Sequence, residues 1–259
     1  MYNNSKNTVF DISDLKIGNK TADIPIDKKM LFFPNEYVVL TDNHIYIQGY
    51  YKAQTFRKRI IKNKVPTFTE STDTVILKGG TLKKPIDAFT YQKSWHNPLI
   101  ANTEGVSLER INPNKPSNEA SNWQSAAQTV GYATPGRQNS QFKQPDSSSV
   151  SAQSRRVFEL EKKTFSPDND GFDDFLVLNY RFDKGGFAAS IYIFDDKGKP
   201  IKTLIKNTLL ETEGNINWQG DTDEGLQTRQ GVYIIVIEWV SPMGQVERQK
   251  LACVVAGRL

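Results

Sequence analysis

The chain has 259 residues, of which 37% are hydrophobic, 24% charged and 11% aromatic, and its net charge is +4. This length allows one large all-β domain or two of ordinary size, and the composition excludes a disordered chain. The longest apolar run, residues 232–240, is short and contains Glu238, so the sequence predicts no transmembrane segment. The single cysteine, Cys253, excludes an intrachain disulfide and any multi-cysteine metal site, and its apolar surroundings predict a buried, unreactive thiol.

Short runs of branched and aromatic residues, separated by turn sequences, predict an all-β fold. The strands expected in the first half are EYVVL (36–40), HIYIQGYY (44–51), DTVILKG (73–79) and DAFTY (87–91). Those expected in the second half are FLVLNYRF (175–182), ASIYIFD (189–195), IKTLI (201–205), GVYIIVIEWV (231–240) and KLACVV (250–255). Turns are expected at residues 195–198, 220–225 and 241–244. Residues 54–64 fit either a helical turn or a basic edge strand.

Residues 141–155, QFKQPDSSSVSAQSR, interrupt this pattern, and their Ser, Gln and Pro content is typical of a flexible linker. The net charge is +6 over residues 1–140, +1 over residues 141–155 and −3 over residues 156–259. A change of sign is typical of two independent modules. We therefore predict two tandem β-sandwiches, residues 1–140 and 156–259, joined by this linker.

The segment from 86 to 140 carries several characteristic motifs. They are Tyr91, Trp95-His96, GVSLER at 105–110, Asn122-Trp123, ATPG at 133–136 and Asn139-Ser140. Together they resemble the lamin tail domain family as it occurs in secreted bacterial proteins, over roughly the first 140 residues. The resemblance implies an immunoglobulin-like sandwich located outside the cell.

Within that segment, Trp123 is expected to fill the core of the sandwich, because it brings a large apolar body with one N–H to satisfy. Pro135-Gly136 predicts a type II turn, in which Gly supplies the positive φ. Members of the family have a further strand before the residues that match Tyr2–Ser5 here. The resemblance thus implies that the first strand is lacking, and we expect pairing with another chain at this truncated first sheet.

The second half resembles a different module. Its matching residues are IYIFD at 191–195 with Gly198, Trp218-Gln219-Gly220 and Gly231-Val232-Tyr233. They resemble the immunoglobulin-like domain of the flagellar hook-capping protein and the related C-terminal domains of exported proteins from gliding bacteria. The resemblance implies that this domain serves export, by type IX secretion, or anchoring.

Four carboxylates lie close together in SPDNDGFDD, residues 166–174: Asp168, Asp170, Asp173 and Asp174. Such a density of hard oxygen ligands favours calcium over softer metals. The alternative is a solvated turn in which the carboxylates accept hydrogen bonds from nearby backbone amides.

A basic run is interleaved with aromatic residues in the first half. Its members are Lys52, Arg57, Lys58, Arg59, Lys62 and Lys64. They could contact the phosphates of nucleic acid or another polyanion, or form a solvated, charged edge. Nearby Tyr46, Tyr50 and Tyr51 fit either carbohydrate stacking or interior packing.

The sequence contains none of the usual nucleophile-elbow, phosphate-loop or zinc-protease motifs. Of its two histidines, His44 and His96, the second lies within a motif of structural character, and the carboxylates of Glu211 and Glu213 fall in an expected turn. We therefore expect a chain that is not an enzyme but a secreted or cell-surface structural or binding module, the C-terminal part of a larger exported protein. Its partners would be other surface proteins or polysaccharide. The alternative is a nucleic-acid- or polysaccharide-binding accessory module of a secreted hydrolase.

Overall fold

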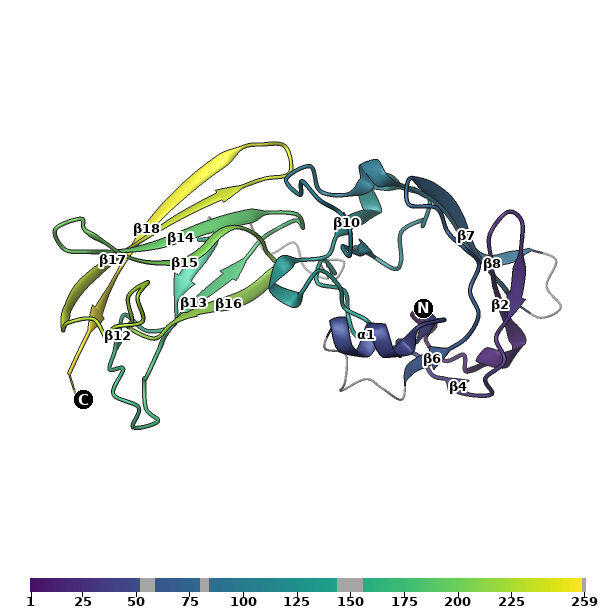
Figure 1. Ribbon diagram of the computed structural model, residues 1–259, viewed down its shortest axis with the longest axis horizontal. Coiled ribbons are helices and arrows are strands. Elements are labelled where there is room, and N and C mark those ends of the chain that lie inside the picture. Colours follow the sequence, from purple (N-terminus) through teal and green to yellow (C-terminus); the bar gives the residue numbers. More distant parts are fainter. Residues whose placement is uncertain (52–58, 80–83, 144–155, 258–259) are drawn as a thin grey trace. The chain divides into compact units, whose positions relative to one another are not determined.

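A computed structural model describes residues 1–51, 59–79, 84–143 and 156–257 of the chain. The chain forms two compact units (Figure 1). Unit 1 comprises Met1–Ala126 and Val130–Pro145, and unit 2 comprises Ala127–Thr129 and Asp146–Leu259. Strands dominate both units, and α1 (His44–Tyr50) is the single α-helix of the described residues. The predicted all-β, sandwich-type fold is confirmed.

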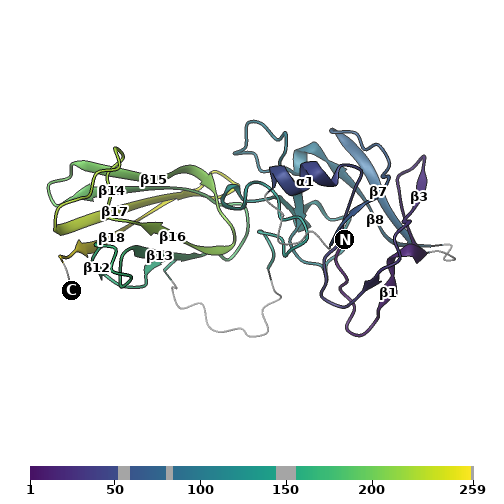
Figure 2. The ribbon, with the colours of Figure 1, turned by 60° about the horizontal axis from the view of Figure 1, so that its bottom comes forward.

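Unit 2 consists of two facing sheets (Figures 1 and 2). Its strands are β11 (Phe158–Leu160), β12 (Thr164–Phe165), β13 (Leu176–Arg181), β14 (Ala188–Asp195), β15 (Pro200–Leu209), β16 (Glu213–Trp218), β17 (Gly231–Val240) and β18 (Val246–Val255). One sheet has the order β12-β18-β17-β14-β15, in which β12 runs parallel to β18, and the other has the order β11-β13-β16. The strands expected at 175–182, 189–195, 201–205, 231–240 and 250–255 therefore all form.

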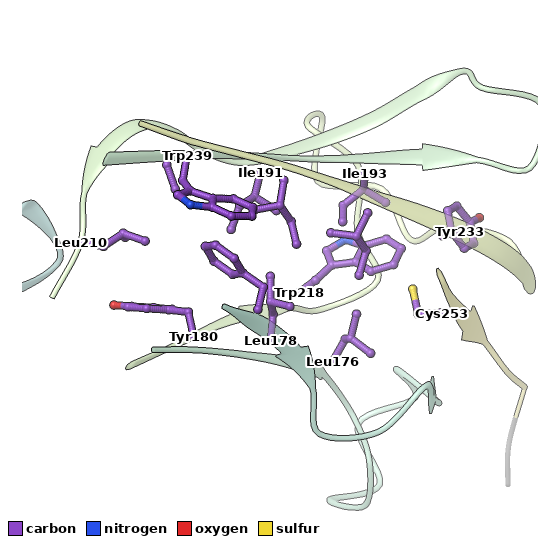
Figure 3. Packing of buried hydrophobic residues seen from close by; sticks show 14 of the residues in the cluster. Leu176, Leu178, Tyr180, Ile191, Ile193, Leu210, Trp218, Tyr233, Trp239 and Cys253 are labelled. Atoms are coloured by element: carbon purple, nitrogen blue, oxygen red, sulfur yellow. The ribbon is translucent and has the colours of Figure 1, made fainter. Parts of the chain in front are cut away.

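The core of unit 2 lies between these sheets because its strands alternate inward and outward residues. On β17, Tyr233, Ile235, Ile237 and Trp239 are buried, and their neighbours are more exposed. Figure 3 shows Tyr233 and Trp239 across the core from Leu176, Leu178 and Tyr180 of the opposite sheet. Trp218 is 1% exposed and satisfies its N–H by donating to the Asp221 carbonyl at 2.9 Å.

Unit 1 is built from shorter strands. They are β1 (Phe10–Asp11), β2 (Leu15–Gly18), β3 (Asp23–Pro25), β4 (Leu31–Phe32), β5 (Val39–Thr41), β6 (Ile60–Lys62), β7 (Thr72–Gly79), β8 (Pro85–Gln92), β9 (Leu108–Arg110) and β10 (Trp123–Ser125). One sheet has the order β3-β2-β7-β8, and three two-stranded sheets pair β1 with β4, β5 with β6, and β10 with β9. The described 3-10 helices are η1 (Ile12–Asp14), η3 (Lys93–Trp95), η4 (Ala120–Asn122) and η5 (Gln128–Val130).

The first residues of unit 1 run antiparallel to residues 35–38. The Met1 carbonyl accepts from the Val38 N–H at 2.9 Å, and the Asn3 N–H donates to the Glu36 carbonyl at 3.1 Å. The Met1 amine donates to the Val38 carbonyl at 2.6 Å. Burial lowers the pKa of this amine to about 6, because desolvation penalises its charged form.

Residues 44–51, expected as a strand, form helix α1 instead. The Asn43 Oδ1 accepts the N–H of Tyr46 at 3.0 Å and caps the helix, and Tyr46 stacks on Tyr50 one turn later. A capping residue and an i, i+4 aromatic pair both favour a helix, which outweighs the strand preference of Ile and Tyr. Among the residues described, no helix is long and apolar enough to cross a membrane.

The predicted linker differs from the structure at its start. Gln141 is fully buried, and Lys143 donates its N–H to the Ile111 carbonyl at 3.0 Å, so residues 141–143 pack within unit 1. This packing could not be predicted from the linker sequence, because Gln is rarely buried. The remainder, 144–155, lies outside the described residues. Of residues 54–64, β6 at Ile60–Lys62 pairs in parallel with β5, while positions 54–58 fall outside the description.

Candidate functional site

The aspartate loop, residues 166–174, connects β12 to β13 in unit 2. Oxygens of Asp168, Asp170 and Asp174 lie within 4.8 Å of one another, so three of the four predicted carboxylates come together. Asp168 Oδ1 accepts the N–H of Asp170 at 3.2 Å, and Asp170 Oδ1 accepts that of Phe172 at 2.8 Å. Asp174 Oδ2 accepts the N–H of Gly171 at 2.9 Å. Asp168 Oδ2 also accepts from Ser166 Oγ at 3.4 Å, so the three carboxylates shape the turn, as the solvated-turn alternative expects.

Asp173 lies outside this cluster and instead pairs with Lys162, whose Nζ is 2.6 Å from Oδ1. The ammonium holds this carboxylate away from the group, so Asp173 does not belong with the other three ligand candidates. Asp174 Oδ1 has no hydrogen-bond partner although the atom is buried. A buried carboxylate oxygen without a partner is unfavourable, and a cation beside Asp174 would relieve it. Calcium binding at Asp168, Asp170 and Asp174 stays a prediction.

The basic run is divided by the structure. Lys52, Arg57 and Lys58 lie outside the described residues. Arg59 is paired with Glu36, which neutralises its charge locally, whereas Lys62 and Lys64 are exposed. The described part of the run therefore presents two exposed cations.

The sequence allowed either carbohydrate stacking or interior packing for Tyr46, Tyr50 and Tyr51, and the first two do not pack in the interior. Tyr46 and Tyr50 are 48% and 58% exposed and stack at 5.0 Å between ring centroids. Tyr51 is half-buried and donates its hydroxyl to the Gly105 carbonyl at 2.9 Å. Burial raises the pKa of Tyr51. Tyr51 therefore anchors the helix, and the other two rings remain on the surface.

Residues 109–141 hold a network of buried polar groups. Glu109 on β9 is 3% exposed, and its carboxylate accepts from Thr134 Oγ1, from Ser140 Oγ at 2.6 Å and from the Gln141 N–H at 3.3 Å. Asn122 is 1% exposed and both donates to and accepts from the backbone of Asn112. These contacts join β9 to residues 134–141 and close the loop between residues 112 and 122.

The turn at residues 134–137 confirms the type II prediction. Gly136 has φ +76°, and the N–H of Arg137 donates to the carbonyl of Thr134 at 3.3 Å. A positive φ at the third position of a turn is the conformation for which Gly is suited.

Unit 1 also contains an aromatic hollow that the sequence interpretation missed. Its volume is about 280 Å³. It is lined by Glu70, Val75, Phe89, Tyr91, Lys93, His96, Val106, Leu108 and Trp123. Trp123 was expected to be core, but it is only half-buried, with its N–H donating to the Ser117 carbonyl at 2.8 Å. The period-2 spacing of Phe89 and Tyr91, which puts both on one face of β8, is the signal that could have indicated it.

His96 lies at the edge of this hollow with a defined tautomer. Ser125 Oγ, from a fully buried residue, accepts the N–H of Asn97 at 2.9 Å and lies 2.9 Å from His96 Nδ1. Because the buried hydroxyl needs an acceptor for its own proton, it donates to Nδ1, which leaves the imidazole proton on Nε2. Burial, and then the charge of Lys93, lower the pKa of His96 and favour this neutral form.

Opposite charges meet on the rim of the hollow. Lys93 Nζ lies 2.5 Å from Glu70 Oε1, and both side chains are well exposed. The hydrogen bond from Lys93 lowers the pKa of Glu70.

In unit 2, Cys253 is 1% exposed and burial raises its pKa to about 12, which agrees with the expected unreactive thiol.

No family model matches the chain, and no curated protein matches it. Among solved structures, the chain is similar to PorZ, described as an essential bacterial surface component of the type IX secretion system of Porphyromonas gingivalis. The two are 18% identical with a TM-score of 0.27. The match covers 42% of this chain and spans 12% of the length of that one. A TM-score this low assigns no shared function.

Proposed function

We propose that this chain is a non-catalytic binding module of an exported protein that works outside the cell. Unit 1 supplies the binding surface, and unit 2 serves export or anchoring. The proposal is supported by the resemblance of residues 86–140 to lamin tail domains of secreted proteins. It is supported equally by the resemblance of residues 156–259 to C-terminal domains of exported proteins.

The observation that carries the binding role is the contact between His96 and Ser125. The 2.9 Å between His96 Nδ1 and Ser125 Oγ is typical of a base and its nucleophile. The Ser125 hydroxyl, however, is fully buried and already accepts the Asn97 N–H. A nucleophile must reach its substrate, so this serine acts as a hydrogen-bond partner that orients the imidazole. His96 is thereby held as a neutral polar group at the edge of an open aromatic hollow, an arrangement suited to binding.

The role of unit 2 in export can be tested in a bacterium that has a type IX secretion system. A signal peptide and a fluorescent reporter would be fused before the full chain, and before the chain shortened to residues 1–143. We expect the full fusion to reach the cell surface, where an externally added protease removes the reporter. The shortened fusion should stay in the periplasm. Equal surface exposure of both fusions would refute the export role.

Of the two binding alternatives, the described residues favour polysaccharide over nucleic acid. Nucleic-acid binding requires a continuous stripe of cations, whereas Arg59 is neutralised by Glu36. Among the described members of the run, Lys62 and Lys64 are the exposed cations, and two charges provide a weak electrostatic attraction. The aromatic hollow, in contrast, offers the combination of apolar surface and polar rim that a saccharide requires.

A further inference from the structure

Strands from two different sheets bring apolar surface together in the aromatic hollow. Val75 on β7 lies directly opposite Phe89 on β8, and Tyr91 follows on the same face. Leu108 on β9 and Trp123 on β10 complete the apolar lining, with the rings of Phe89 and Trp123 4.5 Å apart. These side chains are all partly exposed, so the hollow presents aromatic surface to solvent.

The rim adds polar groups of every kind needed to bind hydroxyls. Glu70 can accept hydrogen bonds and Lys93 can donate them. His96 offers the N–H of Nε2, which has no hydrogen-bond partner among the described residues. Because Glu70 and Lys93 neutralise one another, the rim carries polar groups without a net charge. A ligand that fits both floor and rim has an apolar face and several neutral hydroxyls.

The volume limits the size of the ligand. Sites that bury drug-sized molecules have volumes of roughly 300–1,000 Å³. The 280 Å³ of the aromatic hollow therefore suits one ring-sized group. In unit 2, a larger recess of about 450 Å³ is lined by residues such as Ser166, Gln227 and Gln230 and by no aromatic side chain. The floor of aromatic surface thus distinguishes the hollow of unit 1.

Two other ligand classes fit less well. A quaternary ammonium would also be drawn to the aromatic faces, but Lys93 brings a like charge to the same rim, and the carboxylate of Glu70 is already paired with it. An added peptide strand needs a free sheet edge beside the hollow. On β8, however, the Thr90 N–H donates to Asn118 Oδ1 at 3.3 Å and the Ala88 carbonyl accepts from Ser117 Oγ at 3.4 Å.

From this geometry we infer that the aromatic hollow of unit 1 binds one pyranose ring of a neutral polysaccharide. The C–H face of the ring packs on Phe89, Tyr91 and Trp123, and its hydroxyls contact Glu70, Lys93 and His96. The inference deepens the proposed binding role of unit 1 and is independent of export by unit 2. A chain that fails to be exported can still bind saccharide, and the reverse also holds.

Tryptophan fluorescence provides a direct test on the full chain. Trp218 and Trp239 in unit 2 are 1% and 5% exposed, whereas Trp95 and Trp123 in unit 1 are half-buried, so acrylamide should quench mainly the latter pair. Hexasaccharides of glucose, N-acetylglucosamine, mannose and galactose would be titrated at millimolar concentration. We expect at least one to protect the quenchable fluorescence with a saturable curve. The absence of protection by all four would overturn the inference.

Variants then locate the site. Tyr91→Ala removes one aromatic wall and should weaken binding about tenfold. Lys93→Ala, at an exposed position where substitution should change folding stability little, should weaken binding several-fold. Tyr46→Ala removes a more exposed ring from α1 and should leave binding unchanged. Loss of binding in Tyr46→Ala alone, or protection by choline in place of the saccharides, would overturn the inference.

Discussion

Unit 2 is held together by a continuous apolar core, whereas unit 1 combines a small apolar cluster with a network of buried polar side chains. Among the described residues, the core of unit 2 has 17 buried members and the cluster of unit 1 has six. Thirteen polar residues are buried among the described residues of the whole chain, and eleven of them lie in unit 1. Unit 1 thus depends on directional contacts and unit 2 on packed apolar area.

This difference has a consequence for binding. Long strands with strict alternation direct their large apolar side chains inward, so unit 2 leaves its aromatic core residues covered. In unit 1, β9 and β10, which line the hollow together with β8, have three residues each and leave Phe89, Tyr91 and Trp123 partly open to solvent. Partial closure of a β-sandwich therefore leaves an aromatic surface available to a ligand, held in place by the neighbouring polar network.

The largest effect is expected from the core of unit 2. Ile237→Ala on β17 removes a fully buried side chain and should lower the free energy of unfolding of unit 2 by roughly 2–5 kcal/mol. Val232→Ala on the same strand is the matched control, because Val232 is 47% exposed and should change little. Hydrogen exchange measured on peptides of unit 2 reports both. Equal effects would mean that β17 does not face a packed core.

In unit 1 the corresponding weak point is polar. Glu109→Ala leaves the donors of Thr134, Ser140 and Gln141 without their acceptor, and each buried unsatisfied group costs about 1–3 kcal/mol. Allowing for water entering the space, we expect a loss of about 2–4 kcal/mol in unit 1, measured by hydrogen exchange of its peptides. Glu104→Ala, at an exposed position, should be neutral. A neutral Glu109→Ala would show that the network contributes little.

Calcium should act on unit 2 alone if the aspartate loop binds it. A ligand present at a hundredfold excess over its dissociation constant stabilises the folded state by about 2.7 kcal/mol. We expect the unfolding midpoint of the full chain to rise between excess EDTA and millimolar calcium.

The double variant Asp168→Ala/Asp170→Ala should abolish that rise. Asp173→Ala should retain it, because Asp173 pairs with Lys162, and so should Asp196→Ala in a distant exposed turn. An unchanged midpoint in the unmodified chain would leave the carboxylates as turn residues only.

The smallest expected effect is a pH dependence in unit 1. The pKa of the Met1 amine falls from 8.0 to about 6 on folding, so between pH 6 and pH 8 the unfolded chain binds more protons. The free energy of unfolding therefore rises with pH across this window. It is highest above pH 8 and falls by on the order of 2 kcal/mol as the pH is lowered to 6. The lowered pKa of His96 acts in the same direction below its ordinary value of 6.5.

Denaturant unfolding at pH 6 and pH 8 measures this dependence. Adding two residues before Met1 moves the amine to a new position and should remove most of the slope, while the contribution of His96 remains. An identical slope in the extended chain would assign the effect to other groups.

Much of unit 2 was predictable because its signals are local. Runs such as GVYIIVIEWV form strands, and the turns expected at 195–198, 220–225 and 241–244 form with Gly198, Gly225 and Gly244 at φ of +82°, +79° and +80°. Each depends on a few neighbouring residues, whose preferences agree with the tertiary structure.

Unit 1 was less predictable because its decisive contacts are distant in the sequence. The burial of Glu109 depends on donors more than 20 residues away. The separation of Asp173 from the other three aspartates likewise depends on Lys162 in the preceding segment. No local pattern reports such contacts. Helix α1 is different, because its Asn43 cap and its Tyr46–Tyr50 pair are local signals that the strand interpretation left out of account.

The alternation of side chains along the strands and the positions of glycine and proline were sufficient to specify an all-β chain and most of its turns, because both act over a few bonds. Which aromatic residues are enclosed and which remain open depends instead on how completely two sheets cover each other. That coverage is set by strand length and by contacts between remote segments. Trp123 and Trp218 are the same residue type and both lie on strands, and only the tertiary structure makes one the wall of a hollow and the other a core residue.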